Sequence, residues 1–184
     1  MLKSMYFAGI GGQGLQVVGK TIAEVANEKG YHVTYSPKYD TAKRGGLTSC
    51  FVVISDEEIG NPRKKMQDLL LVMEPKAYAQ FHHDVKPGGT LIVNSTLVPQ
   101  VEEADEGVKQ VMVPLHEICA ELGNTKVISS VALGAVAELL KDIFPDTEEF
   151  LGFMLQQLKK RPDLMDLNKK AFEAGNKAMK ESLA

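Results

Sequence analysis

A glycine-rich segment near the start of the chain carries the clearest chemical signal. Residues 9–14 read Gly-Ile-Gly-Gly-Gln-Gly and follow the apolar run Met5–Ala8 directly. A turn of this kind between a strand and a helix points backbone N–H groups at a ligand, and the helix N-terminus adds partial positive charge. Gly9, Gly11 and Gly14 have the spacing with which proteins bind the pyrophosphate of a dinucleotide.

The acidic residue that completes a dinucleotide site is missing from its expected position. This residue lies about 20 residues past the glycines, at the end of the second strand, where it holds the ribose hydroxyls. We expect a helix from Gln13 to about Lys29 and a second strand over His32–Ser36. The nearest acid, Asp40, lies beyond Pro37. The sequence therefore argues against independent NAD binding. In the alternative interpretation, the glycines only allow a tight turn and close packing of the helix against the strand.

Length and composition are those of an ordinary soluble globular protein. The chain has 184 residues, of which 44% are hydrophobic and 24% charged, and this length favours one domain. A net charge of −3 gives no basic surface for nucleic acid or an anionic membrane. We find no apolar run of membrane-spanning length, and residues 1–10 fit a strand better than a signal peptide. We expect a cytoplasmic protein that binds neither nucleic acid nor membrane.

The cysteines and histidines give no metal-binding pattern. The two cysteines, Cys50 and Cys119, lie in apolar segments and are expected to be buried. They are too few for the thiolate set of an iron–sulfur cluster. His82 and His83 are adjacent, so on a helix their side chains would point in different directions, and the other two histidines are isolated. We therefore expect no metal site.

Strand-like and helix-like segments alternate along most of the chain. The expected strands are Met5–Ala8, His32–Ser36, Ser49–Ile54, Leu69–Met73, Thr90–Val93 and Gln110–Val113. Because these runs are continuously apolar, they predict a mostly parallel sheet covered on both faces. With right-handed crossovers this is a Rossmann-like, doubly wound α/β fold with helices on both faces. From Ile128 onward the pattern predicts a helical C-terminal segment, within a single domain over residues 1–184.

The helix expected over Thr147–Leu158 is apolar nearly all round. A surface helix of a monomer this small should have a polar face, and contiguous exposed apolar surface marks an interface. We therefore expect Phe150, Phe153 and Met154 to form part of a subunit contact.

A long polar loop is expected over Pro37–Gly46, on the same side of the sheet as the glycine turn. Arg44, followed by Gly45 and Gly46, would present a guanidinium beside open backbone N–H groups, to an anion or to a partner's carboxylate. A surface loop with a solvated arginine is the alternative, which composition alone favours. The sequence offers no nucleophile with an adjacent base, so we assign no catalytic residue.

The order of these motifs resembles the gamma subunit, or gamma domain, of 2-oxoacid:ferredoxin oxidoreductases, the pyruvate, ketoisovalerate and 2-oxoglutarate family. The resemblance covers essentially the whole chain. Ser130 stands where Asn is common in the family. The segments that carry the resemblance are Gly9-x-Gly-Gly-Gln-Gly14, Gly30, Tyr39 with Arg44-Gly45-Gly46, Ser130-Val-Ala-Leu-Gly134 and Asn168-x-x-Ala171-Phe172-x-x-Gly175.

The resemblance implies an accessory subunit of a heteromeric enzyme that oxidatively decarboxylates a 2-oxoacid to acyl-CoA. That enzyme uses thiamine diphosphate, magnesium, iron–sulfur clusters and coenzyme A, and reduces ferredoxin. The alpha and beta subunits and, where present, a ferredoxin-like delta subunit would hold these cofactors, so this chain would hold none and would not be active alone. The residues expected to contact a cofactor or a partner subunit are Gly9, Gly11, Gly12, Gln13, Gly14, Tyr39, Arg44, Gly45 and Gly46.

Two other functions stay open at this point: a free-standing Rossmann-type nucleotide-binding reductase and a non-enzymatic ligand sensor. The missing acid counts against the reductase, and the apolar helix favours a subunit because a subunit needs a docking surface. The substrate stays open among 2-oxoglutarate, branched-chain 2-oxoacids, pyruvate and aryl pyruvates. Overall family likeness slightly favours the first two.

Overall fold

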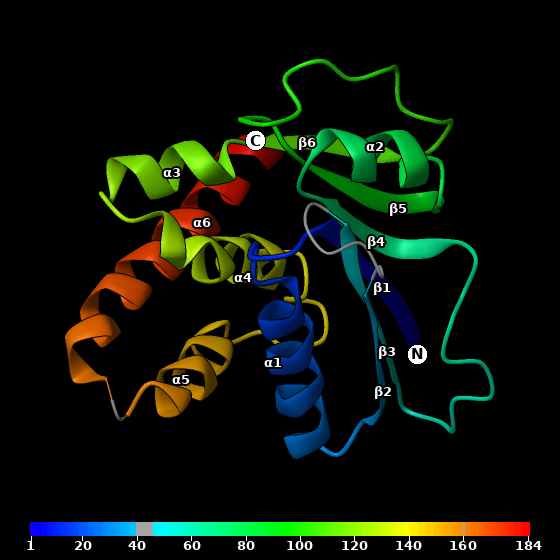
Figure 1. Cartoon of the computed structure of the whole chain (residues 1–184). Coiled ribbons are helices and arrows are strands. Elements are labelled where there is room, and N and C mark those ends of the chain that lie inside the picture. Colours follow the sequence, from blue (N-terminus) through cyan, green and yellow to red (C-terminus); the bar gives the residue numbers. More distant parts are fainter. Residues whose placement is uncertain (40–45, 160) are drawn as a thin grey trace. The chain divides into compact units, whose positions relative to one another are not determined.

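The chain forms two compact units in a computed structural model that describes residues 1–39, 46–159 and 161–184 (Figure 1). The first unit is Met1–Met112 and the second is Val113–Ala184. The single domain that the sequence predicts for the whole chain stays a prediction.

The first unit is built on a mixed sheet. The described strands are ordered β2-β3-β1-β4-β5-β6. β1 pairs in parallel with β4, and β4 with β5, whereas β3 runs antiparallel to both β1 and β2. In chain order the elements are β1 (Leu2–Ile10), α1 (Leu15–Glu28), β2 (His32–Tyr39), β3 (Leu47–Ser55), β4 (Gln67–Val72), α2 (Pro75–Phe81), β5 (Val85–Asn94) and β6 (Lys109–Val113).

The two helices of this unit cover opposite faces of the sheet. Successive residues of a strand point to opposite faces, so Cys50 and Phe51 of β3 face different helices. Gly19 of α1 lies against Cys50. Phe51 stacks on Tyr6 with ring centroids 4.1 Å apart, beside the apolar cluster that includes Tyr78 of α2. The predicted Rossmann-like α/β architecture with helices on both faces is thereby confirmed.

The edge of the sheet differs from the sequence prediction. The sequence predicts a loop from Pro37 onward, but β2 continues to Tyr39, and β3 begins at Leu47. Pro37 pairs in register with Cys50, and a proline is tolerated there because β2 is an edge strand. The remaining connection, residues 40–46, is too short for a crossover, so β3 returns antiparallel. The continuous apolar pattern of β3 reflects cover on both faces and not parallel pairing.

The second unit is helical, as the sequence predicts for the C-terminal segment. Its elements are α3 (Leu115–Glu121), the 3₁₀ turn η1 (Thr125–Val127), α4 (Ile128–Glu138), α5 (Glu148–Gln157), the 3₁₀ turn η2 (Pro162–Leu164) and α6 (Met165–Leu183).

None of the helices in the described part of the chain, in either unit, is long and apolar enough to cross a membrane.

Helices α4 and α6 approach each other until backbone touches backbone. A Cβ atom added to Gly134 would overlap the carbonyl oxygen of Phe172, and one added to Gly175 would overlap the carbonyl oxygen of Val131. Neither carbonyl is the end of a flexible side chain that could move aside. Only glycine therefore fits at these two positions without separating the helices.

Polar side chains hold the same two helices in register. The Ser130 hydroxyl donates to Oδ1 of Asn168 at 2.5 Å, and the Asn168 amide donates to the carbonyl of Leu164 at 2.7 Å. Further along α6, the Asn176 amide donates to Oε2 of Glu138 at 3.0 Å. The two C-terminal segments that carry the resemblance, around Ser130 and Asn168, thus meet in one structural contact.

Gly175→Ala should destabilise the protein by about 2 kcal/mol or more, because forcing an extra methyl group into a packed contact costs roughly 1–3 kcal/mol. The matched variant is Gly152→Ala in α5, where an added Cβ meets nothing within 4 Å. That variant should be neutral or gain up to about 1 kcal/mol from better helix propensity. Denaturant unfolding followed by circular dichroism measures both, and equal stabilities would contradict the close helix contact.

Candidate functional site

The glycine turn is closed by the side chain of Gln13. Its Oε1 accepts a hydrogen bond from the backbone N–H of Ile10 at 2.8 Å. A Cβ atom on Gly9 would overlap this Oε1 and press on Cβ of Met73. Gly9, still within β1, is therefore required so that Gln13 can fold back over the end of the strand. Gln13 precedes α1 and is not its first residue, contrary to the predicted helix start.

The other glycines of the turn serve the backbone. Gly12 and Gly14 have φ values of 95° and 71°, in the left-handed region that favours glycine. Gly14 precedes α1 and gives it no side-chain cap, and its carbonyl accepts from the N–H groups of Val17 and Val18. A Cβ atom on Gly11 would meet nothing within 4 Å. Backbone geometry thus accounts for most of the glycine spacing without a ligand.

Hydrogen bonds beside the turn tie α1 to the sheet. The Tyr35 hydroxyl donates to Oε1 of Gln16 at 2.6 Å, and the Gln16 amide donates to the carbonyl of Ser49 at 2.8 Å. The Tyr6 hydroxyl donates to Oγ of Ser49 at 2.9 Å. Burial raises the pKa of Tyr6, and it raises the pKa of Tyr35 to about 12. Both phenols therefore stay protonated at neutral pH and act as structural donors.

The order of the strands separates β2, the strand expected to carry the ribose-binding acid, from β1. Gly9 of β1 and Tyr39 of β2 reach the same edge of the sheet, as predicted, because both lie in register with Thr48 of β3. However, β3 separates β1 from β2, so the end of β2 lies two strand spacings, roughly 10 Å, from β1. Asp40, the next residue, lies outside the described residues. In a dinucleotide site the acid stands at the end of the strand next to β1. The end of β2 is not in that position, so an acid there would lie too far from the glycine turn.

The loop predicted to contact a ligand or partner is only partly described. Tyr39 is 66% exposed at the end of β2, and Gly46 is half-buried just before β3. Arg44 and Gly45 lie outside the described residues, so their role stays a prediction. A cavity of about 300 Å³ opens beside Tyr39, with walls from three strands and α2; its lining residues are Tyr6, Lys38, Tyr39, Leu47, Ser49, Gln80 and Phe81.

The apolar residues of α5 pack largely inside the helical unit. The Phe150 ring is fully buried and meets Phe144 edge-on, with centroids 5.1 Å apart. Met154 is buried and its sulfur lies 3.2 Å from the Ser130 hydroxyl oxygen. Phe153 is half-buried. Phe150 and Met154 therefore have structural partners that the sequence did not reveal, and the predicted subunit contact stays a prediction that now rests on Phe153.

Both thiols are buried, as the sequence predicts. Burial raises the pKa of Cys50 to about 12 and that of Cys119 to about 11. The Cys50 thiol donates to the carbonyl of Leu15 at 3.4 Å. Because the thiolate is the metal ligand and the nucleophile, these two protonated thiols fit neither an iron–sulfur cluster nor covalent catalysis.

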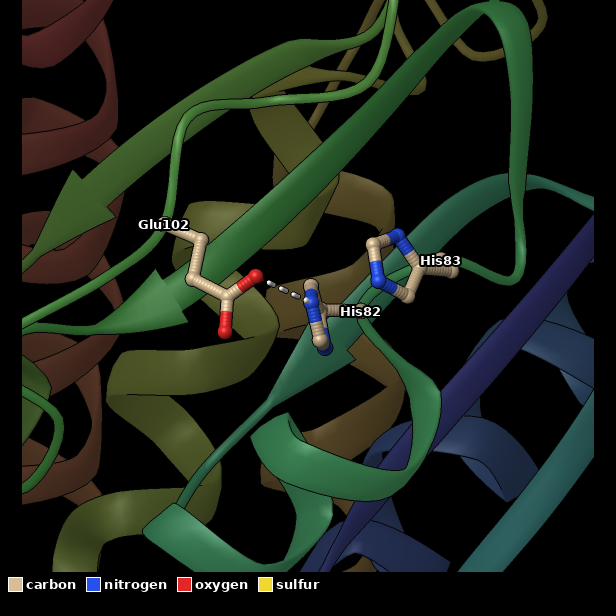
Figure 2. Close-up of side chains that lie close together, drawn as sticks. All are labelled: His82, His83 and Glu102. Atoms are coloured by element: carbon tan, nitrogen blue, oxygen red, sulfur yellow. Dashed lines mark ion pairs between the residues drawn. The ribbon is translucent and has the colours of Figure 1, made fainter.

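The structure brings together three polar side chains that the sequence treats as unrelated. The rings of His82 and His83 lie side by side with centroids 3.8 Å apart, whereas adjacent helical positions predict divergence. α2 ends at Phe81, and His82 is the residue that follows it. His83 therefore lies outside the helix, and its side chain does not have to point in the direction that a helical position would impose. Glu102, from the acidic segment before β6, lies 3.7 Å from Nε2 of His82 (Figure 2). Only the path of the chain between β5 and β6 brings it there.

Comparisons with known sequences match nearly the whole chain. The family described as "Pyruvate ferredoxin/flavodoxin oxidoreductase" matches residues 4–178. Ketoisovalerate oxidoreductase subunit VorA of Methanothermobacter thermautotrophicus is 31% identical over 177 residues, which cover 96% of this chain but 36% of VorA. The chain thus spans about a third of the length of that relative. 2-Oxoglutarate synthase subunit KorC of Methanothermobacter marburgensis is 33% identical over 144 residues, covering 75% of this chain and 77% of KorC.

A solved structure of similar length has the same fold. The gamma subunit of a keto/oxoacid ferredoxin oxidoreductase from Geobacter sulfurreducens PCA superposes with a TM-score of 0.83 at 27% identity. The match covers 99% of this chain and 98% of that subunit. The chain therefore shares the α/β fold of that gamma subunit.

The purified chain should not bind NAD(H) or NADP(H) at physiological concentrations. The physical reason is the position of β3, which keeps any acid of β2 away from the glycine turn. Isothermal titration calorimetry with each nucleotide checks this, with a known dinucleotide-binding enzyme as the positive control. A dissociation constant in the micromolar range would contradict it and favour the free-standing reductase.

Proposed function

The chain belongs to the pyruvate ferredoxin/flavodoxin oxidoreductase family, and from this premise we propose that it is the accessory gamma subunit of a heteromeric 2-oxoacid:ferredoxin oxidoreductase. The assembled enzyme decarboxylates a 2-oxoacid, transfers the acyl group to coenzyme A and passes electrons to ferredoxin. The similarity to KorC and to the Geobacter gamma subunit supports a gamma-type role.

The observation that supports this proposal is that several of the family-like segments form packing contacts. Gly9 makes room for Gln13, and Gly134 and Gly175 let α4 and α6 touch. Ser130 and Asn168 bond to each other between the same two helices. These residues shape a scaffold, which is the contribution expected of an accessory subunit.

The thiols of the chain support the same division of labour. An iron–sulfur cluster takes four ligands, usually cysteine thiolates, and the sequence has two cysteines. Both are buried with raised pKa values. We therefore assign the iron–sulfur clusters to other subunits, together with thiamine diphosphate, magnesium and coenzyme A. The proposed partners are the alpha and beta subunits and a ferredoxin-like delta subunit, with ferredoxin as the acceptor of the complex.

The proposed docking edge combines the glycine turn with the end of β2. Tyr39 exposes two thirds of its surface there, and exposed aromatic side chains are enriched in protein interfaces. Lys38 adds a cation to the neighbouring cavity. The segment Arg44-Gly45-Gly46 lies farther along the connection that follows β2 and would contact a carboxylate of the partner. Ketoisovalerate and 2-oxoglutarate, which appear in the names of the relatives, are the substrates to test first.

The isolated chain should show no 2-oxoacid-dependent reduction of a viologen dye, even with thiamine diphosphate, magnesium and coenzyme A supplied. It has no thiolate set that could carry electrons. Co-expression with thiamine-binding and cluster-binding chains encoded by neighbouring genes should restore activity, and omission of this chain should lower it. Robust dye reduction by the lone polypeptide would overturn the proposal.

Phe153→Asp should weaken association with the partner subunits about tenfold or more, because a charge would replace a half-buried ring at the proposed contact. The matched control is Gln156→Asp, at an exposed position of the same helix. Co-purification and gel filtration measure association, and circular dichroism of the isolated variants separates lost association from lost folding. A folded Phe153→Asp chain that assembles like the control would remove α5 from the interface.

A further inference from the structure

Three potential metal ligands converge at the end of α2 (Figure 2). His82 and His83 follow the helix directly, and Glu102 comes from the connection between β5 and β6. One ligand atom from each of the three side chains lies within 4.8 Å of the other two. The ligands come from two separate parts of the first unit, so the cluster is a product of the fold.

His82 is oriented for metal binding. Its Nδ1 lies 2.8 Å from the carbonyl oxygen of Tyr78. A carbonyl can only accept, so Nδ1 carries the proton and Nε2 presents its lone pair. The side chain is 10% exposed, and Nε2 is buried without a hydrogen-bond partner among the described residues. A buried polar atom without a partner is unfavourable, and a cation beside Glu102 would satisfy it.

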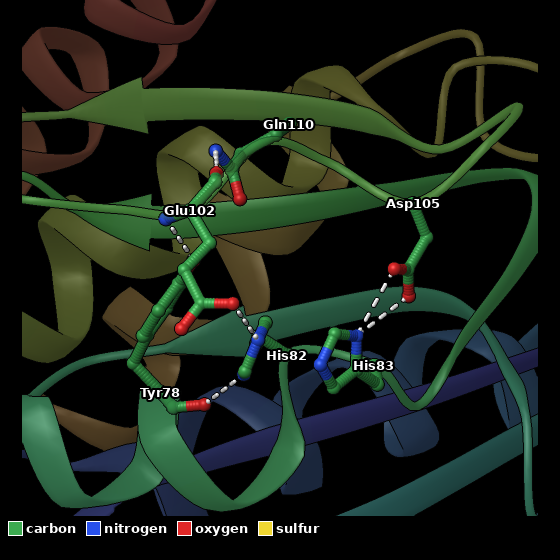
Figure 3. A network of polar contacts seen from close by, with 6 residues as sticks. All are labelled: Tyr78, His82, His83, Glu102, Asp105 and Gln110. Atoms are coloured by element: carbon green, nitrogen blue, oxygen red, sulfur yellow. Dashed lines mark hydrogen bonds and ion pairs between the residues drawn. The ribbon is translucent and has the colours of Figure 1, made fainter.

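His83 has the support that metal-binding histidines usually have. Its Nδ1 lies 2.9 Å and 3.0 Å from the two carboxylate oxygens of Asp105. This contact places the proton on Nδ1 when the ring is neutral, which leaves Nε2 as the ligand atom. Figure 3 shows this second nitrogen turned toward His82. A carboxylate behind the histidine fixes its orientation and increases its basicity, as in carboxylate–histidine–zinc arrangements.

Hydrogen bonds hold the backbone of Glu102 in place, whereas its side chain is largely exposed to solvent. The Glu102 N–H donates to the Tyr78 hydroxyl at 2.9 Å, and the Glu102 carbonyl accepts from the Gln110 amide at 3.1 Å (Figure 3). The side chain is 74% exposed, so its carboxylate can turn toward the two imidazoles. Tyr78 thus contacts both His82 and Glu102 and links the two halves of the cluster.

We propose that His82, His83 and Glu102 bind a divalent transition-metal cation, with Zn²⁺ as the ion that fits best. Two imidazole nitrogens and one carboxylate oxygen are a ligand set that Zn²⁺ favours, with water at the remaining position. Ligand atoms around Zn²⁺ lie roughly 3.3 Å apart, from bond lengths of about 2.0 Å. The exposed Glu102 side chain makes this approach by rotation, and the exposed His83 shifts together with its Asp105 partner, while His82 stays fixed. Mg²⁺ and Ca²⁺ fit this site poorly, because they favour oxygen donors and two of the three donors are nitrogens.

The bound ion would clamp the end of α2 to the connection between β5 and β6. This site is independent of the proposed subunit role, since its residues take no part in the glycine turn or in α5. The proposed metal site does not depend on assembly with partner subunits, so metal binding can be tested on the chain by itself.

The test is a Zn²⁺ titration of the purified full-length chain after chelator treatment, by calorimetry or competition with a chromogenic chelator. We expect one Zn²⁺ per chain with a dissociation constant in the micromolar range or lower. His83→Gln and Glu102→Gln should each weaken binding about tenfold or more, and Asp105→Asn about tenfold, through the supporting carboxylate. These three side chains are largely exposed, so the variants should fold. His32→Gln, which removes an exposed histidine elsewhere, is the matched control and should bind normally.

Cobalt provides a second measurement of the same site. Co²⁺ should give visible absorption bands of a tetrahedral site in the wild-type chain, and these should be lost in His83→Gln but kept in His32→Gln. Wild-type protein that takes up no Zn²⁺ at about 100 μM would overturn the proposal. Equal Zn²⁺ affinities for wild type, His83→Gln and Glu102→Gln would do the same, and an equal loss in His32→Gln would show scattered surface binding instead.

Discussion

The short connection between β2 and β3 is the constraint on which the first unit depends. Residues 40–46 cannot carry a crossover, so β3 returns antiparallel and pairs with β2 on one side and β1 on the other. This places β2 at the edge of the sheet, where Pro37 is tolerated, and puts two strand spacings between its end and the glycine turn. The glycine spacing of a dinucleotide site is therefore present without the neighbouring strand that would supply the ribose contact.

A second constraint, the close crossing of α4 and α6, organises the helical unit. Gly134 and Gly175 remove the side chains that would keep the helices apart, and the bond between Ser130 and Asn168 fixes their register. Once the backbones touch, Met154 of α5 can reach the Ser130 hydroxyl. The two C-terminal segments that carry the family resemblance thus specify how the helical unit packs.

Local patterns were enough to predict most strands and helices, because apolar runs such as Met5–Ala8 are buried wherever they lie in the sheet. They could not predict the direction of β3, since a strand covered on both faces has the same composition in either direction. They misplaced Phe150 because an apolar helix is equally well buried by its own neighbours or by a partner. They gave no signal for Glu102 beside His82, since that contact depends on the long connection before β6. The predictions for Arg44 and Gly45 lie outside the described residues and stay predictions.

A subunit in the proposed accessory role would act through the surfaces that it presents, so the rigidity of those surfaces matters. The Gln13 side chain closes the glycine turn, and the Gln16 amide fastens the start of α1 to β3. These bonds hold the glycine turn, one part of the proposed docking edge, in a single arrangement, which would lower the entropy that association must overcome. A partner that binds only the folded chain also stabilises it in proportion to the logarithm of its concentration over the dissociation constant. The packing around the glycine turn would thus offer a partner subunit a preformed surface.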